Sequence, residues 1–199
     1  MITLERFRLL EASLRRAGYG PMIEWSEAIE PARDAETFAE RAIYVICNSG
    51  MANHVATLIY ERCLTALRDN VAVAKVFGHP GKAAAIERIW RERAGLFAAF
   101  TNADDPVPAL EQLPWIGPIT AQHLAKNLGH DVAKPDVHME RLARVEETTT
   151  AELCARLARE TGYRVATIDS VLWRACANRI LRSAVYERDG WDAAFTPVP

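Results

Sequence analysis

The sequence predicts an all-α protein, and two observations carry that prediction. Apolar residues recur at three- and four-residue spacing along much of the chain, the pattern of helices that bury one face. Alternating runs of Val, Ile and Thr, which would indicate strands, are almost absent, whereas Ala and Arg are abundant. The chain has 199 residues, half of them apolar. That is enough for one sizeable core or for two small lobes that share a cleft.

The first half of the chain divides into helices at glycine, proline and capping residues. The spacing predicts an amphipathic helix over residues 3–17, followed by a loop that contains Trp25 and runs to Pro31. Asp34 is placed to cap the next helix, which ends near residues 48–50. The expected elements after it are a helix over 52–67, a short helix from Asp69 or Asn70 to Phe77, and a long helix over 82–100.

The second half of the chain is divided by a tight apolar turn. A turn-rich link over 102–108 and a short helix over 109–112 precede this turn, which occupies residues 113–117. Pro118 suits the first position of the following helix, which we expect to end at Gly129. The remaining expected features are a helix capped by Thr149 or Thr150 with Glu152 in its first turn, a long helix over 165–185, and a frayed tail over 196–199.

Charge and cysteine usage bear on the kinds of site to expect. The formal net charge of −2 is not that of a bulk polyanion binder, so any contact with DNA must come from a few placed groups. The cysteines form no CxxC pair, so neither a zinc site nor an iron–sulfur cluster has the spacing that it needs. They are Cys47, Cys63, Cys154 and Cys176, which we expect to be buried thiols. The N-terminus lacks a signal-peptide core and no apolar run approaches membrane length, so we expect a cytoplasmic protein without a membrane partner.

Two short motifs carry most of the functional information. The first is Leu-Pro-Trp-Ile-Gly at residues 113–117, and the second is Lys-Pro-Asp-Val-His at residues 134–138. A turn of the first kind leaves backbone N–H groups open at a helix start, where a phosphate can bind. The second motif brings a carboxylate, Asp136, just past the expected end of that helix. A phosphate anchor with one carboxylate suggests chemistry on a nucleotide.

Together these motifs resemble the helix-hairpin-helix Gly/Pro-Asp (HhH-GPD) superfamily of DNA base-excision glycosylases, which includes relatives of endonuclease III and 8-oxoguanine glycosylase. Residues 113–117 are similar to the family's hairpin, and residues 134–138 to its Pro-Asp loop. Weaker similarities lie at residues 46–53, 78–86 and 168–173, so the resemblance covers about residues 38–182.

The resemblance implies a fold, an activity and a partner. The fold is a single two-lobed helical glycosylase unit over residues 1–199 with a central cleft. One lobe is a helical barrel with the hairpin over 38–130, and the other combines 1–37 with 131–199. The activity is excision of a flipped-out modified base from double-stranded DNA, in base excision repair, by a nucleoid-associated monomer.

Three departures from the family pattern refine this expectation. Ile119 stands where bifunctional members carry the lysine that forms a Schiff base, so we expect hydrolysis without strand-cleaving lyase activity. Trp115 replaces the usual hairpin glycine, so its ring needs space beside the DNA or in the protein. The C-terminal cysteine cluster of some members is missing, so no iron–sulfur cofactor is implied.

Asp136 is the candidate catalytic residue. Breaking a base–sugar bond leaves an oxocarbenium-like sugar, which a nearby carboxylate stabilises, and the same carboxylate can orient or deprotonate the attacking water. The alternative is a helix N-cap, because Asp136 precedes a helical pattern. Both roles are compatible.

The turn at 113–117 is the candidate phosphate site. The main-chain N–H groups of Gly117, Ile119 and Thr120 are the expected donors. By resemblance, the main-chain carbonyls of Glu111, Leu113 and Ile116 would hold a structural Na⁺ or K⁺, and no cofactor is required. The alternative is an ordinary connector between two helices.

The remaining candidates would contact DNA or the excised base. His138, Lys126 and Lys134 are candidate DNA contacts, with ordinary surface or core side chains as the alternative. Met51 is the candidate wedge that fills the gap left by the flipped base, Asn48 and Asn53 are alternatives that would contact the opposite strand, and Met51 as a core residue is the other interpretation. Trp25, Trp115, Trp173, Asp169 and Ser170 are candidates for the base pocket, for which core packing competes.

Two other functions remain open. A non-catalytic module would bind DNA structure through the hairpin alone. A bifunctional glycosylase/lyase would use Lys126 or Lys134 as a displaced amine. The identity of the base, and whether the role is repair or the removal of modified bases from foreign DNA, do not follow from the sequence.

Overall fold

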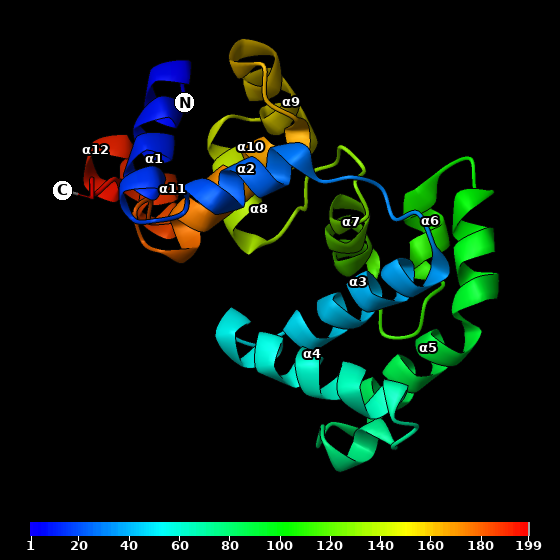
Figure 1. Cartoon of the computed structure of the whole chain (residues 1–199). Helices are drawn as coiled ribbons and strands as arrows, with labels where there is room; N and C mark the ends of the chain where they lie inside the picture. Colours follow the sequence, from blue (N-terminus) through cyan, green and yellow to red (C-terminus); the bar gives the residue numbers. More distant parts are fainter. Residues whose placement is uncertain (199) are drawn as a thin grey trace. The chain divides into compact units, whose positions relative to one another are not determined.

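The structure is a computed structural model that describes residues 1–198, apart from the side chain of Asn53. Helices account for its regular structure, and the predicted all-α class is confirmed (Figure 1). Across the described residues, the β-type pairing is one isolated bridge between Leu181 and Phe195. Contacts divide the chain into unit 1, Met1–Ile29 with His130–Pro199, and unit 2, Glu30–Gly129. The lobe boundary expected between 37 and 38 falls inside the third helix, which belongs wholly to unit 2.

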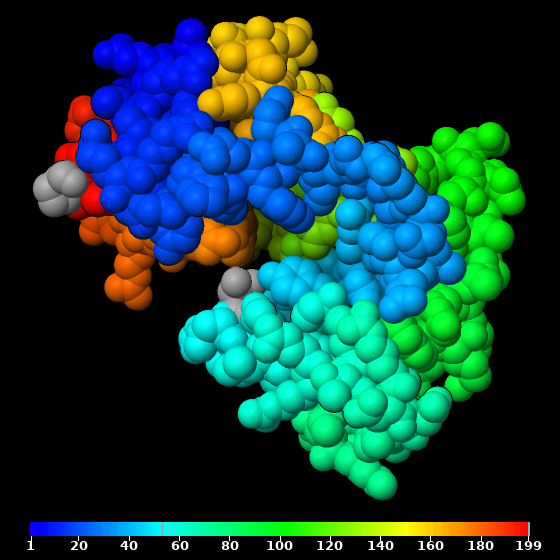
Figure 2. Space-filling view, viewed as in Figure 1, coloured from blue at the N-terminus to red at the C-terminus, as the bar shows by residue number. Residues whose placement is uncertain are grey.

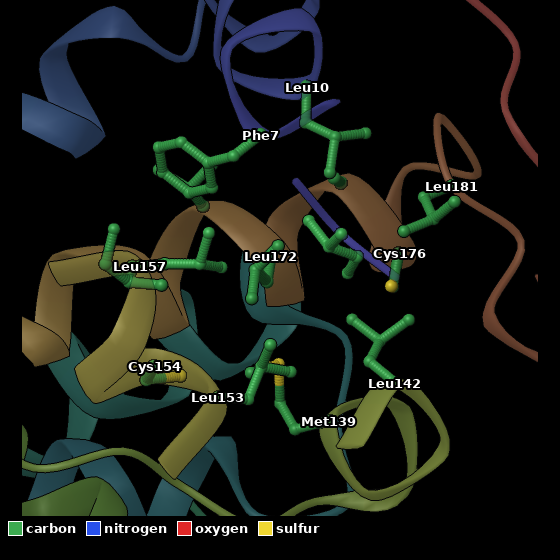
Figure 3. Close-up of a cluster of buried hydrophobic side chains, with 14 of the residues drawn as sticks. Phe7, Leu10, Met139, Leu142, Leu153, Cys154, Leu157, Leu172, Cys176 and Leu181 are labelled. Carbon is green, nitrogen blue, oxygen red and sulfur yellow. The ribbon is translucent and has the colours of Figure 1, made fainter. Parts of the chain in front are cut away.

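Unit 1 is built around one central helix. Its elements are α1 (Leu4–Arg16), α2 (Gly20–Ala28), α8 (Val137–Val145), α9 (Thr150–Thr161), α10 (Val165–Ala177), α11 (Ser183–Asp189) and α12 (Trp191–Ala194). Helix α10 packs against α1, α2, α8 and α9. Figure 3 shows Leu172 of α10 among Phe7, Leu157 and Met139, which come from three other helices. These side chains are fully buried, so helix α10, to which the loop before α8 is bonded, belongs to a closely packed apolar core.

Unit 2 consists of helices packed around α3. Its elements are α3 (Ala35–Asn48), α4 (Asn53–Arg68), the 3₁₀ turn η1 (Val73–Lys75), α5 (Pro80–Thr101), α6 (Pro106–Glu111) and α7 (Pro118–Asn127). Helix α3 contacts α4, α5 and α7, and its apolar face is buried from Phe38 to Cys47. Helix α4, cyan in Figure 2, lies at the surface of the unit, where Val55 and Leu58 are exposed.

Several predicted caps and buried groups are confirmed. Asp34 accepts a hydrogen bond from the Thr37 N–H at 2.7 Å and starts α3. Thr149 and Glu152 form a capping box at the start of α9. The four cysteines are buried thiols, as expected. Within the described residues, no helix combines the length and the apolar character that a membrane span needs.

Two predicted elements are wrong in the first half of the chain. The loop expected around Trp25 is instead the helix α2, because Pro21 occupies its first turn, where proline starts a helix rather than ending one. The helix expected up to Phe77 is only the turn η1. Asp69 caps the C-terminus of α4 instead of starting a helix, and Asn70 takes a left-handed conformation with φ of 55°.

Two boundaries are also wrong in the second half. The helix expected over 165–185 stops at Ala177, because Arg179 has φ of 61°, a left-handed conformation that a helix cannot continue through. The chain then reverses, and the Leu181 N–H bonds to the Ala175 carbonyl at 3.1 Å. Helix α6 begins at Pro106 rather than at 109, since the Asp105 side chain accepts from the Val107 N–H.

Candidate functional site

The start of α7 presents open backbone N–H groups. Gly117 is its N-cap residue, with extended backbone and no side-chain cap, and Pro118 occupies the first helical position, as predicted. The N–H groups of Ile119 and Thr120 follow in the first turn, where no preceding helical carbonyl is available to them. Ile119 is 49% exposed. Two amides at the positive end of a helix dipole are arranged to bind an anion.

The turn before α7 is held by short-range hydrogen bonds. The Leu113 N–H donates to the Leu110 carbonyl at 3.0 Å, and the Ile116 N–H donates to the Leu113 carbonyl at 3.2 Å. The Leu113 carbonyl therefore has one lone pair left for the cation that the family resemblance implies. Oxygen donors of this kind suit an alkali cation, so the carbonyls of Glu111, Leu113 and Ile116 remain compatible with Na⁺ or K⁺.

Trp115 lies at the tip of this turn in an unusual conformation. Its φ is 68°, which is rare for a large side chain. Trp115 as a residue is 46% exposed, and its ring packs edge-on against His79, with ring centres 5.0 Å apart. A Cβ added to Gly81 would lie 2.7 Å from the ring atom Cζ3. The ring therefore finds its space on the first turn of α5, and Gly81, which sequence reasoning did not single out, provides it.

The turn between α3 and α4 carries the candidate wedge. The Met51 N–H bonds to the Asn48 carbonyl at 3.3 Å, and Gly50 has φ of 73°. Lys82 of α5 donates from Nζ to the Ser49 carbonyl at 2.5 Å, although its side chain is nearly buried and burial lowers its pKa. Met51 is half-buried beside this anchor. Asn53, the alternative contact, has its side chain outside the described residues.

Asp136 is the N-cap residue of α8, the alternative role that the sequence predicts for it. Its Oδ1 accepts from the N–H groups of His138 at 3.0 Å and Met139 at 3.2 Å. Its Oδ2 lies 3.8 Å from Nζ of Lys134, and the side chain is 15% exposed. Burial, and next to it the charge of Asp136, raises the pKa of Cys176 to about 12. The carboxylate is thus fixed by two amides and has an ammonium group as its neighbour.

His138 and Lys126 differ in how they are held. The His138 ring atom Nδ1 lies 2.8 Å from Oγ of Ser183 in α11, which fixes the orientation of the half-buried ring. Lys126 is half-buried in the last turn of α7, where a cation suits the helix dipole. Contacts of either residue with DNA stay predictions.

Four of the five base-pocket candidates belong to α2 and α10, which pack against each other, and the fifth is Trp115 in the turn before α7. Asp169 and Ser170 are buried and partnered within unit 1. Asp169 accepts from the Lys134 N–H at 3.1 Å, while the Ser170 hydroxyl bonds to the Ala166 carbonyl and lies 3.1 Å from that of Ser26. Trp25 is exposed on α2, and Trp173 is half-buried with the Arg174 guanidinium over its ring.

Neither a metal centre nor a relative adds to these observations. Among the described residues, no group of three or more His, Cys, Asp or Glu side chains is placed to hold a metal ion. No protein-family model, curated protein or solved structure gives a significant match to the chain.

Proposed function

We propose that this protein is a monofunctional DNA glycosylase of the HhH-GPD class, which hydrolyses the bond between a flipped-out modified base and its deoxyribose in double-stranded DNA. The observation that carries the proposal is the fixed carboxylate of Asp136. One of its oxygens is held by two amides of α8, and the group is partly accessible. The two-lobed glycosylase fold is part of the same proposal.

The proposed chemistry asks Asp136 to stabilise positive charge on the sugar. A carboxylate about 4 Å from an oxocarbenium-like sugar, at an effective dielectric near 20, contributes roughly 4 kcal/mol. That corresponds to about a thousandfold in rate. Because α8 holds the carboxylate in place before substrate binds, little of this energy is lost in orienting it.

The proposed binding mode uses few contacts. The open amides at the start of α7 would hold a phosphate. A monovalent cation on the carbonyls of the preceding turn would stiffen that turn. Met51 fills the gap left by the flipped nucleotide, and an aromatic ring such as Trp25 or Trp173 stacks on the base. This mode suits a protein of net charge −2, because it does not depend on a broad basic surface.

Base release from a panel of modified duplexes tests the proposal. The duplexes carry alkylated purines, oxidised guanines or modified pyrimidines, and released bases are detected by mass spectrometry. We expect at least one base to be released, leaving an abasic strand that breaks only after alkali. Asp136→Asn keeps the helix cap and should reduce the rate about a thousandfold. No product from any duplex, or an Asp136→Asn variant as fast as the parent, would contradict the proposal.

A bifunctional glycosylase/lyase is favoured by one specific contact. Nζ of Lys134 lies 3.8 Å from Oδ2 of Asp136, so an amine is present beside the proposed catalytic carboxylate. Borohydride trapping separates the two activities, because only a lyase forms a reducible imine with DNA. We expect no trapped adduct with the parent. An adduct that Lys134→Met abolishes and Lys126→Met retains would establish Lys134 as the displaced amine.

A non-catalytic DNA-binding module is favoured by a different observation. The cap hydrogen bonds from His138 and Met139 already explain why an Asp stands at position 136. Such a module would bind DNA in a salt-sensitive way, and Asp136→Asn would change neither binding nor any product. The panel above distinguishes it from the enzyme.

A further inference from the structure

The loop over residues 130–136, which ends at Asp136, is joined to α10 by two hydrogen bonds, and each of the two elements supplies the accepting carboxylate of one bond. Asp131 belongs to the loop and binds a backbone amide of α10, whereas Asp169 belongs to α10 and binds a backbone amide of the loop. All four groups lie in unit 1. The loop and the helix are therefore joined by a reciprocal pair of hydrogen bonds.

The first of these bonds supplies α10 with a cap. The N-cap residue Arg164 makes no side-chain cap of its own. Oδ1 of Asp131 instead accepts from the Ala166 N–H at 2.9 Å and lies 3.8 Å from Nε of Arg164. A carboxylate at a helix start is stabilised by the dipole, so this bond fixes the beginning of the loop.

The second bond fixes the end of the loop. Asp169 is only 1% exposed, and its Oδ1 accepts from the Lys134 N–H at 3.1 Å. Burying a carboxylate is costly unless it is hydrogen-bonded, so an apolar side chain would serve better if the site needed only packing. The Lys134 carbonyl in turn accepts from the Asp136 N–H at 2.9 Å. Two consecutive hydrogen bonds therefore connect Asp169 to the backbone of Asp136.

We propose that Asp169 is a positioning residue, which holds the turn over residues 134–136 and so sets where the Asp136 carboxylate lies. This inference rests on the proposed function, in which that carboxylate acts on the sugar. A misplacement of about 1 Å costs on the order of a hundredfold in an enzymatic rate. Loss of the Asp169 bond should accordingly lower the rate of base release without lowering DNA affinity.

Three variants test the proposal. Asp169→Ala removes the acceptor, Asp169→Asn keeps an oxygen that accepts the same hydrogen bond, and Thr167→Val is the matched control in the same helix. The Thr167 hydroxyl is also buried, but it donates to Glu27 at 2.6 Å rather than bonding to the loop. Each variant is measured for single-turnover base release at saturating protein, for DNA affinity, and for hydrogen exchange of the Lys134 and Asp136 amides.

We expect Asp169→Ala to slow base release ten- to a hundredfold, with affinity within about threefold of the parent and faster exchange of the Lys134 amide. Asp169→Asn should recover most of the rate, and Thr167→Val should leave rate and exchange unchanged. A folded Asp169→Ala protein with the parent's rate, or with unchanged Lys134 exchange, would overturn the inference. If the parent releases no base, the proposed function fails, whereas the exchange measurement still decides whether Asp169 holds the loop.

Discussion

The starts of α7 and α8 differ in whether a side chain caps their first N–H groups, and they have opposite electrostatic character. Every helix begins with N–H groups that lack helical partners. At α8, the Asp136 side chain satisfies two of them and adds a negative charge. At α7, Gly117 has no side chain, so the amides stay open at the positive end of the dipole. One start is arranged to hold an anion, and the other to present one.

The two starts are also held in place by different forces. Beyond the hydrogen bonds within the turn itself, the turn before α7 is held against α5 by packing, because the Trp115 ring lies against Gly81. The loop before α8 rests on hydrogen bonds to α10, made through Asp131 and Asp169. Binding and chemistry would therefore respond to different substitutions, which makes the comparison open to experiment.

The largest effect on DNA binding should come from making the start of α7 resemble that of α8. Gly117→Asp provides a side-chain cap and a negative charge at a position with extended backbone and open space. The cap should add a few tenths of a kcal/mol of stability, whereas DNA affinity should fall about a hundredfold because the amides are occupied and the phosphate is repelled. Gly117→Ala, which adds a Cβ without a cap, should bind DNA nearly as the parent does. Equal affinity of the Asp and Ala variants in a titration would contradict the phosphate site.

A smaller effect should follow from disturbing the packing behind the turn. Gly81→Ala places a methyl group 2.7 Å from the Trp115 ring, so the ring must move. Its matched control is Gly95→Ala in the same helix, where no atom lies within 4 Å and alanine should raise stability by about 0.5–1 kcal/mol. The Gly81 variant should be less stable than this control by about 1–3 kcal/mol in urea unfolding. Equal stabilities would show that the ring is not held there.

The cap at α8 should have a modest effect on stability that is separate from catalysis. Asp136→Ala leaves the His138 and Met139 amides without their acceptor and should cost about 1 kcal/mol, whereas Asp136→Asn should cost almost nothing. Both variants should lose base release. Thermal unfolding measures the stability of the two variants. A similar melting temperature for Asp136→Ala and Asp136→Asn would mean that the cap bonds contribute nothing to stability.

An effect confined to alkaline pH concerns the Cys176 thiol, whose pKa the Asp136 charge helps to raise. Burial and the Asp136 charge raise the pKa of Cys176 from about 9 to about 12, so the folded state favours the neutral thiol. The stability that this provides is fully present below pH 9 and is lost as the pH rises toward 12. Unfolding free energies at pH 8 and pH 10.5 should therefore fall less steeply with pH in Cys176→Ala than in the parent. Identical slopes would contradict the raised pKa, since Tyr60 and Tyr186 affect both proteins alike.

Local sequence signals predicted the parts of this structure that depend on neighbouring residues. Asp34, Thr149 and Pro118 start helices where capping rules place them, because those rules describe contacts within one turn. The same rules gave a loop around Trp25 that is wrong, because Pro21 lies in the first turn of α2, where proline suits a helix start. They failed again at Arg179, whose left-handed backbone ends α10 without a glycine.

The residues that hold the candidate site were harder to predict. Gly81, Lys82 and Asp131 contact residues that are distant in the sequence. The spacing of apolar residues along the chain does not predict such contacts. The sequence offers Asp169 as a base-pocket candidate, and only the structure shows that it accepts a hydrogen bond from the loop before Asp136. The sequence does show an acidic residue within an otherwise apolar helix. Only the folded structure shows which group that carboxylate binds.

DNA affinity and the rate of base release at saturating protein, measured on the same duplex, separate the proposed roles of the two helix starts. We predict that Asp136→Asn binds within a few-fold of the parent while its rate falls about a thousandfold. Gly117→Asp should bind far more weakly yet approach the parent's rate once saturated. Base release by Asp136→Asn at the parent's rate would contradict the catalytic role of Asp136.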